Sequence, residues 1–166
     1  MQKIHKILAP TDLSEISKVG VRYALELARS VGAEVTVYRV VTPEELVQHG
    51  DQFKSAEALD TVHRLAAPIL HRYEAAMARF LNDNFSDLTP WLRVREKTDI
   101  GRPDKAIAQR AKMEGSDMIV MATHGRSGFA HLLLGSVTEK VVRSAPCAVL
   151  TVHPNSGKEA LEKKAS

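Results

Sequence analysis

The stretch from Asp117 to Val152 sets two short apolar runs on either side of a glycine-containing loop and an amphipathic segment. The first run, Met118 to Ala122, is too short and too uniformly apolar for a surface helix. It is typical of a strand covered on both faces, as in a parallel sheet. The turn from Thr123 to Gly128 then lies at the carboxyl end of that strand. Such turns bind ligands, because the helix that follows presents unpaired N–H groups and a positive dipole end. The ligand so indicated is an anion.

The start of the following helix is indicated by Ser136 and Glu139, which have the spacing of a capping box. A long loop then joins Gly125 to Gly135, and its glycines let backbone N–H groups approach a bound group. Ser136 and Thr138 add hydroxyl donors there. A simpler interpretation is that Ser136 only caps a helix and the glycines only turn the chain. The local chemistry leaves both interpretations open.

Apolar patterning elsewhere alternates between strand and helix. Further strands are expected at residues 4–9, 34–41, 91–97 and 147–153. A helix capped by Asp12 or Ser14 should end at Gly32. A long amphipathic helix is predicted over residues 59–81, with a kink or a new start near Ala67 because Pro68 interrupts it. Another should begin at Pro103 and run to about residue 113. Residues 44–56 carry no firm pattern.

This alternation predicts an α/β fold with a doubly wound parallel sheet of five strands. A chain of 166 residues with 44% hydrophobic content suits one core. We therefore expect a single domain over residues 1–153 and a flexible tail over residues 154–166. The single cysteine, Cys147, excludes an internal disulfide and is expected to be a buried thiol.

Charge and hydropathy exclude two classes of partner. No apolar run reaches the length of a membrane span, and the first residues lack a signal-peptide core, so we expect a cytoplasmic protein and no membrane partner. The net charge of +3 is dispersed along the chain, and aromatic residues make up only 5%. Nucleic-acid binding is therefore not expected, since it requires a basic patch and bases stack on aromatic rings.

The glycine loop resembles that of the universal stress protein family. Its nucleotide-binding members carry two glycines separated by two residues, then nine residues, then Gly-Ser or Gly-Thr. Gly125 matches the second glycine and Gly135-Ser136 the final pair, whereas Ala122 replaces the first glycine. The resemblance includes residues 4–12 and 145–150 and most of the chain, but not residues 42–90.

The resemblance implies a Rossmann-like fold of the adenine nucleotide alpha hydrolase type, with strand order 3-2-1-4-5. It also implies a cytosolic stress-response module that binds ATP or a related adenine nucleotide, with Mg or Mn as an accompanying ion and no metal site from the protein alone. In the family, Asp12 lies against the adenine and the backbone at Val40 meets the ring. The implied nucleotide-binding residues are Pro10, Thr11, Asp12, Val40, Met121, Ala122, Thr123, His124, Gly125, Arg126, Gly135, Ser136, Val137 and Thr138.

This strand order brings Asp12 and Gly125 to one crevice at the point where the sheet reverses direction. Ala122 has two interpretations. If the family needs glycine there for a left-handed backbone, alanine should weaken ATP binding. If the glycine only keeps a Cβ away from the ribose, a small shift of the loop can accommodate the alanine methyl group. In the family the last strand pairs with its copy, which implies a homodimer through Cys147 to Val152. An uncovered apolar edge strand favours the same contact.

Two other functions stay open. His124, Arg126, Asp12 and Ser136 could be assembled into a phosphoryl-transfer site, but the chain lacks the Gly-x-x-x-x-Gly-Lys-Ser/Thr loop and paired acidic metal ligands beside its own loop. Catalytic residues are therefore not assigned, and at most a slow ATPase is expected. The other alternative is a nucleotide-independent dimer that acts through contacts with an unknown protein partner, which the departure at Ala122 favours.

Overall fold

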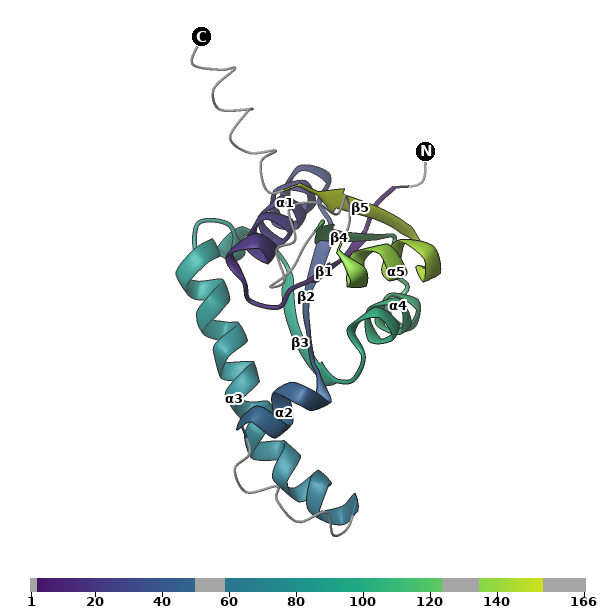
Figure 1. Cartoon of the computed structure of the whole chain (residues 1–166). Coiled ribbons are helices and arrows are strands. Elements are labelled where there is room, and N and C mark those ends of the chain that lie inside the picture. Colours follow the sequence, from purple (N-terminus) through teal and green to yellow (C-terminus); the bar gives the residue numbers. More distant parts are fainter. Residues whose placement is uncertain (1–2, 50–58, 124–134, 154–166) are drawn as a thin grey trace.

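The protein forms a five-stranded parallel sheet with helices on both faces (Figure 1). The structure is a computed structural model that describes residues 3–49, 59–123 and 135–153. The strands stand in the order β3-β2-β1-β4-β5, which confirms the predicted fold class and order. The elements are β1 (Lys6–Pro10), α1 (Glu15–Val31), β2 (Glu34–Val41), α2 (Pro43–His49), α3 (Leu59–Phe85), a 3₁₀ helix (Thr89–Trp91), β3 (Val94–Ile100), α4 (Pro103–Glu114), β4 (Met118–Ala122), α5 (Ser136–Ser144) and β5 (Ala148–Val152).

The strand β1 lies at the centre and pairs in parallel with β2 and β4, so that Leu8 stands beside both Thr36 and Ile119. Alternate residues of each strand point to opposite faces. Ile7 and Ala9 pack under α1 and α3, whereas Leu8 packs under α4 and α5. Both faces of the central strands are therefore buried, which explains their uniformly apolar sequences.

The first face carries the larger core. Small and branched residues of α1 let that helix lie closely on the central strands, and Met77, Phe80 and Phe85 of α3 complete the layer. The second face, under α4 and α5, is smaller, and its buried members are Leu8, Tyr38, Ile107, Ala111, Ile119, Met121 and Val141.

The ends of the helices follow the sequence. Ser14 caps α1 by accepting a hydrogen bond from the Ser17 N–H, and Gly32 ends that helix in the left-handed conformation at φ 72°. Pro103 occupies the first turn of α4, and Gly115 ends it at φ 64°. Within the described segments, no helix combines the length and apolar character needed to cross a bilayer.

Two predictions were wrong in detail, and for a third segment the sequence left a short helix open as one alternative. The strand expected at residues 91–97 begins only at Val94 and continues to Ile100, because Thr89–Trp91 forms a 3₁₀ helix and Val94 is the residue that pairs with Val35 of β2. The long helix does not begin near Ala67 but runs from Leu59 to Phe85 through Pro68. Residues 43–49, where the sequence has no firm pattern, form α2.

The predicted capping box of α5 was also wrong. The helix begins at Ser136, as expected, but Ser136 is its first helical residue and Gly135 occupies the cap position without a side-chain cap. The final strand is β5, one residue shorter at each end than predicted. Cys147 is half-buried rather than fully buried.

Candidate functional site

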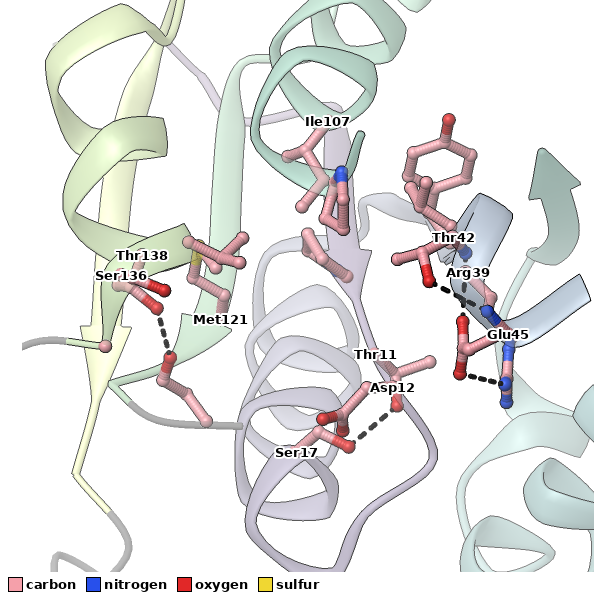
Figure 2. A pocket seen from close by; sticks show the side chains of 17 residues that line it. Thr11, Asp12, Ser17, Arg39, Thr42, Glu45, Ile107, Met121, Ser136 and Thr138 are labelled. Carbon is pink, nitrogen blue, oxygen red and sulfur yellow. Dashed lines mark hydrogen bonds and ion pairs between the residues drawn. The ribbon is translucent and has the colours of Figure 1, made fainter. Parts of the chain in front are cut away.

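A pocket of ≈ 350 Å³ opens at the carboxyl ends of β1, β2 and β4 (Figure 2). Parallel sheets bind ligands at this edge, where the strand order reverses between β1 and β4. Its volume lies near the lower end of the range for small-molecule sites, about 300–1,000 Å³. The lining residues are Pro10, Thr11, Asp12, Ser17, Tyr38, Arg39, Val40, Thr42, Glu45, Pro103, Ile107, Met121, Ala122, Gly135, Ser136, Val137 and Thr138.

The turn between β1 and α1 forms one wall and is held by its own side chains. The hydroxyls of Thr11 and Ser17 are 2.8 Å apart, and the Leu13 N–H donates to Thr11 Oγ1 at 3.0 Å. Leu13 has φ 63°, a left-handed conformation that costs a leucine about 1–2 kcal/mol. These hydrogen bonds hold the turn in that strained form, as is typical of ligand-binding turns.

Asp12 does not cap α1, because Ser14 occupies the cap position, but it supports that cap. Its Oδ1 accepts hydrogen bonds from the backbone N–H of Ser14 at 3.0 Å and from the Ser14 hydroxyl at 2.6 Å. It thus orients the residue that caps α1. Asp12 also lines the pocket, so its carboxylate borders the space available to a ligand.

The first turn of α5 forms the opposite wall. The Gly135 N–H donates to the carbonyl of Thr123 at 2.7 Å, and the Thr138 hydroxyl donates to the carbonyl of Ala122 at 3.1 Å. These bonds fix the helix to the end of β4. The Thr138 proton is therefore already used, whereas the Ser136 hydroxyl, on an exposed residue, does not cap the helix. The helix start presents N–H groups and a positive dipole end to the pocket.

Ala122, which replaces the family's first glycine, ends β4 in register with Val152. Leu13 is the one non-glycine residue with a positive φ among those described, so Ala122 has an ordinary backbone. The backbone at Ala122 is therefore not left-handed in this protein. Behind it, Gly20 of α1 lies so close that a Cβ would stand 2.6 Å from the Ala122 nitrogen.

Between these walls lies an apolar slot formed by Tyr38, Val40, Ile107 and Met121, with Pro103 and Val137 beside them. The Tyr38 hydroxyl donates to Asp99 Oδ2 at 2.7 Å. Burial, together with the negative charge of Asp99, raises the pKa of the Tyr38 phenol well above its ordinary value. The phenol therefore stays neutral, and the buried ring, with the Arg110 guanidinium over it at 5.4 Å, forms part of the slot wall.

The far end of the pocket is polar and was missed by the sequence analysis. Arg39 is buried, with its guanidinium 3.3 Å from Glu45 and 4.7 Å from the centre of the Tyr73 ring. Glu45 Oε2 accepts the Thr42 N–H at 2.9 Å, and Thr42 Oγ1 accepts the Glu45 N–H at 3.2 Å. This reciprocal pair is a capping box that starts α2 and attaches it to the end of β2.

Ten of the fourteen predicted site residues line the pocket: Pro10, Thr11, Asp12, Val40, Met121, Ala122, Gly135, Ser136, Val137 and Thr138. Thr123 lies just behind it and donates its N–H to the Val152 carbonyl at 3.0 Å. His124, Gly125 and Arg126 fall outside the described residues. The residues that the sequence analysis missed are Ser17, Tyr38, Arg39, Thr42, Glu45, Pro103 and Ile107. Thr42-Pro43 followed by Glu45 is itself a helix-start pattern that could have identified α2.

Within the described parts of the chain, no group of three or more His, Cys, Asp or Glu side chains is placed to hold a metal ion. A divalent ion at this pocket would therefore need ligands from the bound molecule, as is common for Mg²⁺ with nucleotide phosphates.

Comparison with known proteins gives a consistent result. The sequence profile described as the universal stress protein family matches residues 3–153. A universal stress protein of Methanocaldococcus jannaschii is 28% identical over 159 residues, which cover 89% of this chain and 81% of that protein. Among solved structures, universal stress protein UspA from Lactobacillus plantarum aligns with a TM-score of 0.68 at 25% identity, over 92% of this chain and 99% of that one.

Two further structures of similar fold contain nucleotides. One is a universal stress protein in complex with cAMP, with a TM-score of 0.61 at 20% identity over 92% of this chain and 99% of that one. The other is the universal stress protein from Archaeoglobus fulgidus in complex with dAMP, with a TM-score of 0.55 at 17% identity over 90% of this chain and 98% of that one. At these low sequence identities, the similarity shows a common fold alone.

Proposed function

Because the chain belongs to the universal stress protein family, we propose that it binds ATP or a related adenine nucleotide and acts as a cytosolic stress-response module. The observation that carries the proposal is the meeting of Asp12 with Gly135 and Ser136 on the walls of one pocket. These residues are far apart in the sequence. They meet because β1 and β4 are neighbours in the sheet.

The pocket suits the parts of an adenine nucleotide in order. The N–H groups at the start of α5 and the Ser136 hydroxyl would bind phosphate oxygens. The slot beside Tyr38 and Ile107 would hold the base, and the Asp12 carboxylate would accept a hydrogen bond from an exocyclic amine. The cAMP and dAMP held by two proteins of the same fold are adenine nucleotides, which supports this choice of ligand.

The apolar slot has to supply much of the affinity. A helix N-terminus stabilises an anion by about 0.3–2 kcal/mol, whereas micromolar binding needs about 8 kcal/mol. Burial of a base in an apolar slot contributes roughly 25 cal/mol per Å² of apolar surface removed from water. Most of that surface would be the base's own, because the walls at Tyr38, Ile107 and Met121 are already buried.

Isothermal titration calorimetry with ATP and GTP tests the proposal. We expect ATP to bind and GTP to bind more weakly, because Asp12 accepts from an amine and repels a carbonyl oxygen. Ser136→Ala should weaken ATP about tenfold, since a hydrogen bond to a charged group contributes about 1.5–3 kcal/mol. Ser144→Ala is the matched control, because Ser144 lies at the other end of the same helix and bonds Lys140. No binding at millimolar ATP, with no nucleotide released from freshly purified protein, would favour the nucleotide-independent alternative.

We further propose that ATP is held rather than rapidly hydrolysed. Both carboxylates that line the pocket are already engaged, because Asp12 accepts from Ser14 and Glu45 contacts Arg39 and the N–H of Thr42. They do not form the paired ligands with which phosphoryl-transfer sites hold a metal. Steady-state turnover with and without Mg²⁺ or Mn²⁺ measures this directly, and a turnover of several per second would contradict it.

We also propose a homodimer through β5. Within the described residues this strand pairs with β4 on one side only, which leaves its outer edge for a partner strand. Sedimentation should show a dimer at tens of micromolar. Val149→Pro, which removes a backbone donor from the strand, should shift the dimer toward monomer, with circular dichroism confirming that the fold survives. A wild type that sediments only as monomer would exclude this contact.

A further inference from the structure

A second hollow, of ≈ 560 Å³, lies at the amino ends of the strands, on the edge of the sheet opposite the nucleotide pocket. It is built from the start of β1, the end of α1, the start of β2 and the segment that follows the 3₁₀ helix. Its lining residues are His5, Lys6, Ala28, Arg29, Gly32, Ala33, Glu34, Trp91, Leu92 and Arg93. We call it the basal pocket.

The basal pocket has an excess of positive charge. Its one acidic lining residue, Glu34, is paired with Arg95 at 2.8 Å. Neither Arg29 nor Arg93 forms an ion pair with a carboxylate of the described residues, and both are exposed. The carboxyl end of α1 adds about half a negative charge, which offsets part of the charge of Arg29 in its last turn. Lys6 adds little, because its Nζ donates to the Glu114 carbonyl at 3.1 Å and its N–H donates to the Asp117 carboxylate. The remaining excess lies on Arg93 and on part of Arg29, so the pocket favours an anion.

Trp91, the chain's single tryptophan, forms one side of the basal pocket and is 74% exposed. It does not lie on a loose loop. The Trp91 N–H donates to the carbonyl of Leu88 at 3.2 Å, and Leu88 is buried in the core under α3. The 3₁₀ helix thus holds a large, exposed apolar ring at a pocket that two arginines also line. Tryptophan and arginine are the residues that contribute most often to the energy of protein interfaces.

We propose that the basal pocket binds an acidic peptide segment of a partner protein. Carboxylates of the segment pair with Arg29 and Arg93, and an apolar side chain between them packs on Trp91 and the half-buried Leu92. Two guanidinium groups beside one ring suit such a segment better than a nucleic acid, which needs a longer basic track and successive stacking rings. Bidentate pairing of arginine with carboxylate adds geometric selectivity.

A selection from a random peptide library on the immobilised full chain tests the proposal. We expect enriched peptides to carry Asp or Glu next to an apolar residue. Titration of one such peptide should change the emission of Trp91, which reports on the basal pocket alone because no other tryptophan is present. Arg93→Glu should weaken the peptide at least tenfold. Lys112→Glu makes the same charge change on an exposed residue of α4 outside the pocket and should have no effect.

The proposal is overturned if no peptide is enriched, if Arg93→Glu binds as well as the wild type, or if Gln can replace Glu in the peptide without loss. Binding of a single-stranded oligonucleotide in preference to the peptide would overturn it in favour of a nucleic-acid surface. Trp91→Phe provides a second check, since it keeps an apolar ring and should retain peptide binding measured by calorimetry. Ser136→Ala should leave peptide binding unchanged, so failure here is distinguishable from failure of the nucleotide proposal.

Discussion

The two faces of the sheet are built differently. Under α1 and α3 the contacts are mostly apolar, with Phe85 and Met77 fully buried, and the buried Arg39 packs on Tyr73 of α3 near the pocket. Under α4 the core is smaller and includes a polar network, in which the Asp99 carboxylate accepts from both Tyr38 and Arg110. The pocket proposed to bind a nucleotide opens on this second face, where Ile107 and Met121 belong to the core and to the pocket wall at once.

This difference indicates that the two faces have different roles, one in stability and one in ligand binding. The first face has little to do but stabilise the sheet, so it can be filled with apolar groups at native density. The second face must leave a space for a ligand and must hold polar groups around it, and every such group needs a partner when buried. Stability is therefore expected to depend most on the first face and ligand affinity most on the second.

The largest expected effect is that of Phe85→Ala. Phe85 is 1% exposed and packs edge to face on Phe80 at 5.5 Å. Its loss should cost about 3–5 kcal/mol of unfolding free energy, because α3 and α1 leave a closed cavity. Ile107→Ala is the counterpart on the second face and should cost about 2 kcal/mol, near the lower limit, since it only enlarges an existing pocket. Urea unfolding would measure the loss of unfolding free energy in both variants. Equal losses would contradict the claim that stability depends most on the first face.

A smaller effect is expected from Gly20→Ala, where α1 lies against the end of β4. The new methyl group would meet the backbone at Ala122 and at Met121, which cannot move cheaply. Overpacking should cost about 1–3 kcal/mol, offset in part by the roughly 1 kcal/mol that alanine gains over glycine in a helix. The same shift of Ala122 should weaken ATP. Gly115→Ala strains a left-handed glycine without such a contact and should leave ATP affinity intact.

The polar network should contribute less, with a dependence on pH. Tyr38→Phe removes one donor to Asp99 and should cost about 1 kcal/mol. Burial alone would raise the pKa of the Asp99 carboxyl, but the hydrogen bonds from Arg110 and Tyr38 outweigh it and lower that pKa below its ordinary value. A lowered folded pKa gives stability that is present above about pH 4, the unfolded pKa, and is lost as pH falls through the folded pKa.

Asp99→Asn provides the test of that sign. Its stability deficit relative to the wild type should be full at neutral pH and should shrink in acid, as measured by urea unfolding at both. A deficit that grows in acid would contradict the assignment of Asp99 as an ionised acceptor.

The smallest expected effect is that of Ala122→Gly on ATP affinity. Since Ala122 has an ordinary backbone at the end of β4, glycine relieves no strain there. It only removes a methyl group from the pocket wall, so we expect a change of less than about threefold, below 1 kcal/mol. A gain of tenfold or more in calorimetry would show that the methyl group obstructs the nucleotide.

The sequence predicted well what depends on local periodicity and on single residues at helix ends. Val35 and Val37 alternate as a strand requires, and Gly32 ends α1 where a left-handed residue is needed. The sequence was a poor guide to features that depend on how strands pair with one another. Trp91 alternates with its neighbours as a strand would, yet the register of β3 on β2 starts at Val94, and nothing local sets that register.

The site followed the same rule. Asp12 was found because it closely follows an apolar strand, and Ser136 because it follows Gly135 at a predicted helix start. Tyr38 and Ile107 were missed because each has an ordinary position in a strand or helix, and only the packing of α4 on β2 brings both to the pocket. Arg39 was missed because an arginine in a strand gives no indication that it will be buried against Tyr73.

The central position of β1 has a consequence for how the chain folds. Lys6 and Asp117 are 111 residues apart and meet only when β4 joins the sheet, so closing that loop carries a high cost in chain entropy. Topologies dominated by such distant pairings fold slowly. On the ribosome, the first three strands emerge before the pocket at the carboxyl ends of the strands is complete, since β4 and α5 follow them in the chain. A ligand of that pocket would therefore stabilise the finished domain by mass action but would not guide the assembly of its first half.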